Sequence, residues 1–166
     1  MRLYNIFFPI WMLIFFPPII LVTLPVNFVF DLAVLMVTLK VLQIDDAWKY
    51  TKAVILRVWL CGFAADLLGA LLMLVPVVPL NLGEPLEAVF YNPFAHAESF
   101  LWTTLCIAVS AAAIYGLNYY FCLRKLPLES RLRRRLSLSL AVFTAPYLYY
   151  MPTNLFYDIM SILIAA

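Results

Sequence analysis

The chain is built from long apolar runs that carry almost no charge. No charged residue lies between Arg2 and Asp31, and Leu136–Ala166 contains a single one, Asp158. Of the 166 residues, 66% are hydrophobic and 12% are charged. Ordinary soluble domains are about 45–50% apolar and about 25% charged. A soluble fold cannot bury this much apolar surface, so the sequence predicts that lipid surrounds most of the chain.

The apolar runs predict helices. They are long and continuous, whereas the strands of a membrane barrel are short and alternate between apolar and polar residues. We therefore expect an all-α integral membrane protein, with residues 1–166 forming a single transmembrane domain of about five helices. The expected helices are residues 3–24, 28–44, 53–76, 99–123 and 136–166, with an outer loop at 77–98 and a basic inner loop at 124–135.

Prolines predict where the first and last runs break. Pro25 predicts a tight turn at residues 24–27, in which Asn27 caps the following helix. The last run would be about 46 Å long as one straight helix, whereas the hydrocarbon core of a bilayer is about 30 Å thick. Pro146 and Pro152 therefore predict a kinked or broken last span. Two interpretations remain open, a single tilted span and a span followed by a re-entrant or interfacial piece, residues 155–166.

The positions of the basic residues predict the orientation. If Arg2 lies inside and five spans alternate, all 11 Lys and Arg residues fall on the inner side. Basic residues are retained on the cytoplasmic side of membranes. We therefore expect a multi-pass protein of the cytoplasmic (plasma) membrane, with its N-terminus inside and its C-terminus outside.

The basic inner loop has a second expected role. Its arginines are predicted to hold this orientation and to contact anionic lipid headgroups rather than nucleic acid. These arginines are Arg131, Arg133, Arg134 and Arg135.

Three carboxylates lie within or close to the predicted spans. Asp66 is near the middle of the third helix, where a charge costs on the order of 2.5–3.5 kcal/mol. Gly62 and Gly69 share its helical stripe, which predicts that Asp66 points into a close helix contact. If the second and third helices form a level hairpin, Asp31 lies beside Asp66. Two such carboxylates would share a proton or a cation. The candidate proton- or cation-binding residues are Asp66, Asp31 and Asp158.

Other interpretations of these carboxylates remain open. Asp31 lies in the first turn of its predicted helix, where a negative charge complements the helix dipole. If the register is counted from the outer turn, Asp31 lies one to two turns above Asp66. Independently of the register, Asp66 could bond a Ser, Thr or Tyr hydroxyl of the fourth or fifth helix and only hold the helices together, or it could contact a partner subunit.

Small residues on the fourth helix predict a further packing face. Ala108, Ala112 and Gly116 recur every fourth residue, which allows two helix backbones to approach closely. The expected partner is another helix of this chain, a second copy in a homo-oligomer, or a partner membrane subunit.

The sequence favours transport over catalysis. It contains no zinc-protease, nucleophile-elbow or phosphate-loop motif and no paired histidines. We expect no enzymatic activity, no metal and no cofactor. The first functional hypothesis is a proton- or cation-handling transport protein, or a subunit of one, that uses buried carboxylates. The alternative is a non-catalytic membrane scaffold or accessory subunit that binds other membrane helices.

Overall fold

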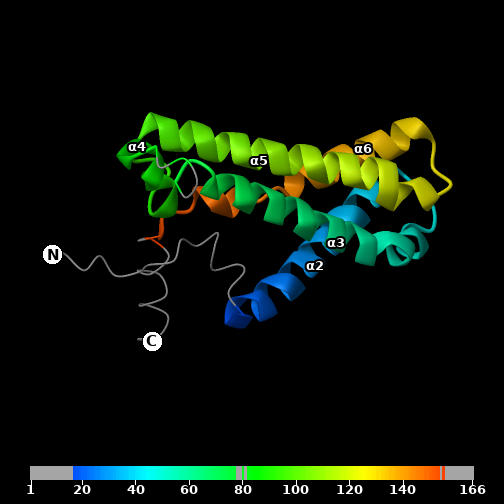
Figure 1. Ribbon diagram of the computed structural model, residues 1–166. Coiled ribbons are helices and arrows are strands. Elements are labelled where there is room, and N and C mark those ends of the chain that lie inside the picture. The colour runs from blue at the N-terminus through cyan, green and yellow to red at the C-terminus, as the bar shows by residue number, and fades with distance from the viewer. Residues whose placement is uncertain (1–16, 78–79, 81, 154, 156–166) are drawn as a thin grey trace. The chain divides into compact units, whose positions relative to one another are not determined.

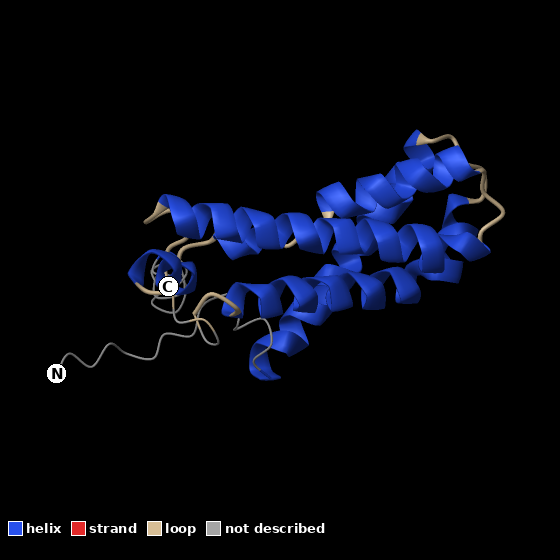
Figure 2. Ribbon diagram, turned by 45° about the horizontal axis from the view of Figure 1, so that its top comes forward, coloured by secondary structure: helices blue, strands red, loops and turns tan. Residues whose placement is uncertain are grey.

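The computed structural model describes residues 17–77, 80, 82–153 and 155, and in these ranges it contains helices and connecting turns but no strand (Figure 2). The all-helical prediction is confirmed for this part of the chain. The chain divides into two compact units. The α6 unit comprises Leu21–Gly69 and Ala108–Pro146, and the α4 unit comprises Met1–Ile20, Ala70–Ile107 and Tyr147–Ala166.

The α-helices are α2 (Pro17–Val41), α3 (Ala47–Leu74), α4 (Glu84–Glu87), α5 (Ala97–Leu117) and α6 (Ser130–Phe143) (Figure 1). Shorter segments are the 3-10 turn η1 (Ala88–Phe90), the π-helical η2 (Asn118–Cys122), and the 3-10 turns η3 (Leu123–Lys125) and η4 (Tyr147–Tyr150). Segments η2 and η3 continue α5 without a break.

In the described part of the chain, three helical segments are long and apolar enough to cross a membrane. They are Thr23–Val41, Ala47–Leu74 and Ala97–Lys125. The predicted first span, residues 3–24, lies largely outside the described residues. The third and fourth predicted spans correspond to α3 and α5, with ends displaced by a few residues.

The turn predicted at residues 24–27 is absent, because α2 continues through it. Pro25 lies inside the helix and has no amide hydrogen to donate to the preceding turn. The neighbouring carbonyl, that of Leu24, accepts a hydrogen bond from Nε1 of Trp59 at 3.1 Å. In an apolar run, one missing helical bond leaves fewer backbone groups unsatisfied than a turn would. Asn27 therefore lies within α2 and does not cap it.

The last apolar run begins earlier and ends sooner than predicted. Helix α6 starts at Ser130, so the arginines assigned to the inner loop form its first turns. It has 14 residues, about 21 Å of helix, which is too short to span a bilayer core of about 30 Å. The break predicted near Pro146 is present, since α6 ends at Phe143 and the 3-10 turn η4 follows the proline.

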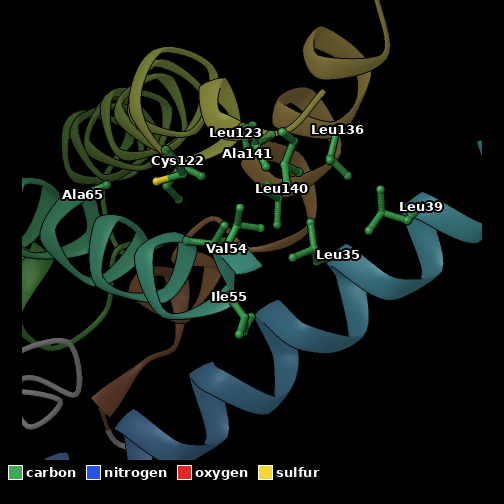
Figure 3. Close-up of a cluster of buried hydrophobic side chains, with 13 residues drawn as sticks. Leu35, Leu39, Val54, Ile55, Ala65, Cys122, Leu123, Leu136, Leu140 and Ala141 are labelled. Atoms are coloured by element: carbon green, nitrogen blue, oxygen red, sulfur yellow. The ribbon is translucent and has the colours of Figure 1, made fainter. Parts of the chain in front are cut away.

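An apolar core holds the α6 unit together. Figure 3 shows side chains from α2, α3 and α6 meeting around Leu140. The two helix-connecting turns of this unit pack on the same cluster, through Ile44 and Leu128. The fully buried members of the core include Leu35, Leu39, Val54, Val58, Ile114, Leu123, Leu136 and Leu140. This core sets the spacing of α2, α3 and α6 just beside the candidate site.

Candidate functional site

Asp31 and Asp66 line one small cavity in the α6 unit. Asp31 comes from α2 and is only 6% exposed, and Asp66 comes from α3. The cavity has a volume of about 30 Å³. A cavity needs about 10–15 Å³ to hold a water molecule, so this one is large enough for water. The two carboxylates are close enough for their charges to interact. The structure therefore brings together the pair that a level hairpin predicts.

Local helix periodicity places Asp31 in this cavity. Asp31, Leu35 and Leu39 are all buried and recur every fourth residue, so they share one face of α2. The two leucines enter the apolar core, and this fixes the direction in which Asp31 points. Because the core buries this face of α2, the carboxylate of Asp31 lies in the interior.

Gly62 allows α2 to approach α3 at the level of the site. A Cβ atom built at Gly62 would lie 3.5 Å from Oδ2 of Asp31. The Asp31 carboxylate therefore rests almost directly on the backbone of α3. Asp66 follows Gly62 by four residues and lies on the same side of the helix. Asp66 and Gly62 therefore share one face of α3, and Gly69, three residues after Asp66, is also buried.

Thr144, at the end of α6, completes the polar lining. Its side chain hydrogen-bonds to Asp31, and its Oγ1 donates to the carbonyl of Leu140 at 2.8 Å. One hydroxyl group has one hydrogen, so Thr144 cannot donate both bonds at full strength. The direction of the bond between Thr144 and Asp31 therefore depends on whether Asp31 carries a proton.

Apolar side chains close the cavity toward one end of the unit. Leu35 lies one turn beyond Asp31, and Val58 lies one turn before Gly62. Together with Leu140, they are fully buried members of the core. This layer separates the carboxylates from the end of the unit that carries the two helix-connecting turns.

Another part of the cavity is lined mostly by aromatic side chains. Asn27 and Phe30 of α2 line it there, with Trp59 and Phe63 of α3. Phe30 is 53% exposed, and Trp59 packs edge-on against Phe28, with ring centroids 5.8 Å apart. The cavity thus has an apolar seal in one part and a wall of aromatic side chains in another.

The small-residue face predicted on α5 makes no close contact within the described residues. Ala108 and Ala112 are exposed, and a Cβ atom added at Gly116 would meet no atom within 4 Å. Within the described residues the stripe therefore packs on no other helix at these positions, and the buried face of α5 is a different one. That face carries Ile107 and Ile114.

The remaining predicted residues are dispersed. Asp158 lies outside the described residues. Arg131, Arg134 and Arg135 are exposed on α6, whereas the guanidinium of Arg133 lies 4.6 Å from the ring centroid of Tyr119. In the described part of the chain, no group of three or more His, Cys, Asp or Glu side chains is arranged to hold a metal ion.

Sequence reasoning missed Thr144 as a member of the site. A signal was present, since Thr144 stands two residues before Pro146, at a predicted helix end. A comparison with protein-family models, curated proteins and solved structures finds no match to this chain. Arguments about its function therefore rest on the geometry of the site.

Proposed function

We propose that the chain is a multi-pass protein of the cytoplasmic membrane that moves protons or small monovalent cations through the pair Asp31 and Asp66. One observation carries the proposal: carboxylates from two different helices line a single cavity of about 30 Å³. Acidic side chains inside membrane spans are rare, and they mark ion and proton pathways.

The electrostatics of the pair argue against a purely structural role. Two negative charges in a low-dielectric interior repel each other and lose their hydration. Such a pair requires a shared proton or a bound cation to neutralise it. A pair selected only for packing would be replaced by neutral side chains of similar size, such as Asn or Leu, without this penalty.

Thr144 supplies a means for the site to respond to a proton. When Asp31 is protonated, it donates to Oγ1 of Thr144, and Thr144 donates to the carbonyl of Leu140. When Asp31 is ionised, the Thr144 hydroxyl turns and donates to the carboxylate instead. Gain or loss of one proton thus reverses a hydrogen bond between α2 and the end of α6.

The distribution of basic residues supports placing the two connecting turns of the α6 unit on the cytoplasmic side. Both connecting turns of the α6 unit pack on one apolar cluster, and Lys40, Lys49 and Arg124 lie at helix ends next to these turns. A short cytoplasmic side rich in Lys and Arg is the usual arrangement. In this orientation the apolar layer at Leu35 and Leu140 closes the carboxylate cavity toward the cytoplasm.

A flux measurement tests the proposal. The full chain is reconstituted into liposomes, and internal pH is followed with an entrapped dye after a pH step, with and without a Na⁺ gradient. Wild type is expected to conduct. Asp66→Asn is expected to reduce the rate of ion flux by more than about tenfold, because an amide neither exchanges a proton nor attracts a cation as a carboxylate does. Glu84→Gln, which removes an exposed carboxylate of α4, is the matched control and is expected to leave the rate unchanged.

Two outcomes contradict the proposal. Wild type that conducts neither protons nor Na⁺ removes it for the chain alone. Equal rates in wild type and Asp66→Asn remove Asp66 from the pathway. Size-exclusion profiles of both variants in detergent separate a loss of activity from a loss of folding.

The second candidate is an accessory subunit that binds other membrane helices. It is favoured by the exposed Ala108 and Ala112, which leave a face of small side chains uncovered within the described part of this chain. Mild solubilisation from native membranes tests it. Co-purification of a membrane partner that Ala112→Leu disrupts would support this function, and a monomer free of partners would contradict it.

A further inference from the structure

Helix α6 exposes a face that changes from basic to apolar along its length. The exposed residues that share this face are Arg131, Arg134, Arg135, Leu138 and Val142. Their spacing of three, one, three and four residues keeps them on one stripe about 100° wide. We call this stripe the α6 lipid face.

We infer that the α6 lipid face binds an anionic phospholipid, with the phosphate at the arginines and an acyl chain along Leu138 and Val142. The order of the groups matches that of a phospholipid, in which a charged headgroup is joined to a hydrocarbon chain. From Arg135 to Val142 is seven residues, about 10.5 Å of helix. The site is separate from the carboxylate cavity and does not depend on the function proposed for it.

The charges around this face favour an anion. Helix α6 contains no Asp or Glu, so nothing on the helix itself competes with a phosphate for the arginines. The N-terminal end of a helix also carries partial positive charge. Glu129 precedes the helix at its cap position and is the nearest acidic residue in the sequence.

The fourth arginine has a different role. Arg133 stacks on Tyr119 of η2, and its Nη2 donates to the Tyr119 hydroxyl at 3.4 Å. The same hydroxyl interacts with Arg134 and raises the pKa of that guanidinium, which stays charged. Tyr119 therefore ties the first turns of α6 to the end of α5, and this tie holds the α6 lipid face in a fixed direction.

Exposed aromatic side chains of η2 lie next to Tyr119, which contacts the start of α6. Tyr120 and Phe121, next to Tyr119 in η2, are 62% and 67% exposed. Tyrosine is enriched where helices cross the boundary between headgroups and hydrocarbon. Basic side chains at this depth attract anionic lipids. These features favour a lipid in the bilayer over a free phosphate ion, which would gain nothing from Leu138 or Val142.

Native mass spectrometry of the full-length protein in detergent tests this inference. Phosphatidylglycerol or phosphatidylcholine is titrated into the micelles, and the fraction of protein with bound lipid is measured. Wild type is expected to bind phosphatidylglycerol at least about tenfold more tightly than phosphatidylcholine. Arg131→Gln with Arg135→Gln is expected to abolish this preference, since two of the three exposed charges of the face are lost.

Two variants serve as controls. Arg124→Gln with Lys125→Gln removes two exposed charges of η3 and is expected to keep the preference within about twofold. Arg131→Lys with Arg135→Lys keeps the charge and is expected to retain most of it, which separates loss of charge from loss of folding.

Three results would overturn the inference. One is equal binding of the two lipids by wild type. Another is an equal loss of preference in the α6 and η3 double variants, which would mean that any basic residue suffices. The third is displacement of phosphatidylglycerol by inorganic phosphate, which would make the face a phosphate site without a lipid component.

Discussion

The α4 unit and the α6 unit both bury neutral polar side chains among apolar helices, and the α6 unit adds two carboxylates. In the α4 unit, two of the buried hydroxyl groups, those of Ser99 and Thr153, bond to backbone carbonyls. The Ser99 hydroxyl lies 3.0 Å from the carbonyl oxygen of Pro93 and 2.9 Å from that of His96, and Thr153 donates to the carbonyl of Phe90 at 3.0 Å. These bonds satisfy backbone groups at the irregular ends of helices and turns. The hydroxyls therefore stabilise the fold.

The α6 unit also buries neutral polar side chains, such as those of Thr51 and Asn118, but it adds a pair of carboxylates. Asp31 and Asp66 line one cavity, with the single hydroxyl of Thr144 beside them. A neutral buried hydrogen bond contributes about 0.5–1.5 kcal/mol, whereas a pair of like charges opposes folding. The hydroxyls of the α4 unit thus stabilise the fold, whereas the α6 unit retains a pair of carboxylates that destabilises it, as a functional site does.

Filling the cavity is expected to have the largest effect on flux. Gly62→Leu is expected to reduce flux in the liposome assay by more than about tenfold, because a branched side chain occupies the space between the carboxylates. Gly62→Ala is expected to retain flux, since its Cβ would lie 3.5 Å from Oδ2 of Asp31, an ordinary contact. Gly116→Leu is the control, since a Cβ there meets nothing within 4 Å. Normal flux in Gly62→Leu would show that the cavity is not on the pathway.

The contrast in stability comes next. Thr153→Val is expected to destabilise the protein by about 1–3 kcal/mol, because the carbonyl of Phe90 loses its side-chain donor. Asp31→Asn is expected to be neutral or stabilising, because it removes a charge from the pair. Denaturation of both variants in mixed micelles, followed by circular dichroism, measures the difference. The reverse order of stabilities would mean that the carboxylates are structural.

A double-mutant cycle measures the smallest expected effect, the coupling free energy between the two carboxylates. Asp31→Asn and Asp66→Asn each remove the same repulsion, so the double variant is expected to gain less than the sum of the two, with a coupling of about 1 kcal/mol. The same denaturation assay provides the four midpoints. Asp66→Asn combined with Glu84→Gln is expected to be additive. Additivity for the aspartate pair would show that the two charges do not interact.

Part of the site could be predicted from periodicity alone. The direction of Asp66 follows from Gly62 and Gly69 on its own helix, and the burial of Asp31 follows from its place on the stripe of Leu35. Within one helix, the face on which a residue lies depends only on its position in the turn. Such local properties are encoded in the spacing of residues along each helix.

Other features depend on which elements meet. Thr144 reaches Asp31 only because α6 ends beside α2, and no spacing in the sequence expresses that. The exposed position of Ala112 has the same origin, since a small-residue stripe becomes a contact only if another helix covers it. Pro25 stays within α2, and Trp59 of α3 donates to the carbonyl of Leu24 and so joins the two helices next to the proline. Each of these outcomes depends on which residues, distant in the sequence, come into contact in the fold.

The helical class, the third and fourth apolar helices, the break near Pro146 and the face of α3 that carries Asp66 follow from the sequence alone. These follow from hydropathy, proline chemistry and the 3.6-residue period, which act over a few turns of one helix. Only the tertiary structure decided that the two carboxylates share a cavity, that Thr144 joins them and that Leu35 and Leu140 seal one side. These depend on the packing of three helices around a common apolar core, and that packing is a property of the whole α6 unit.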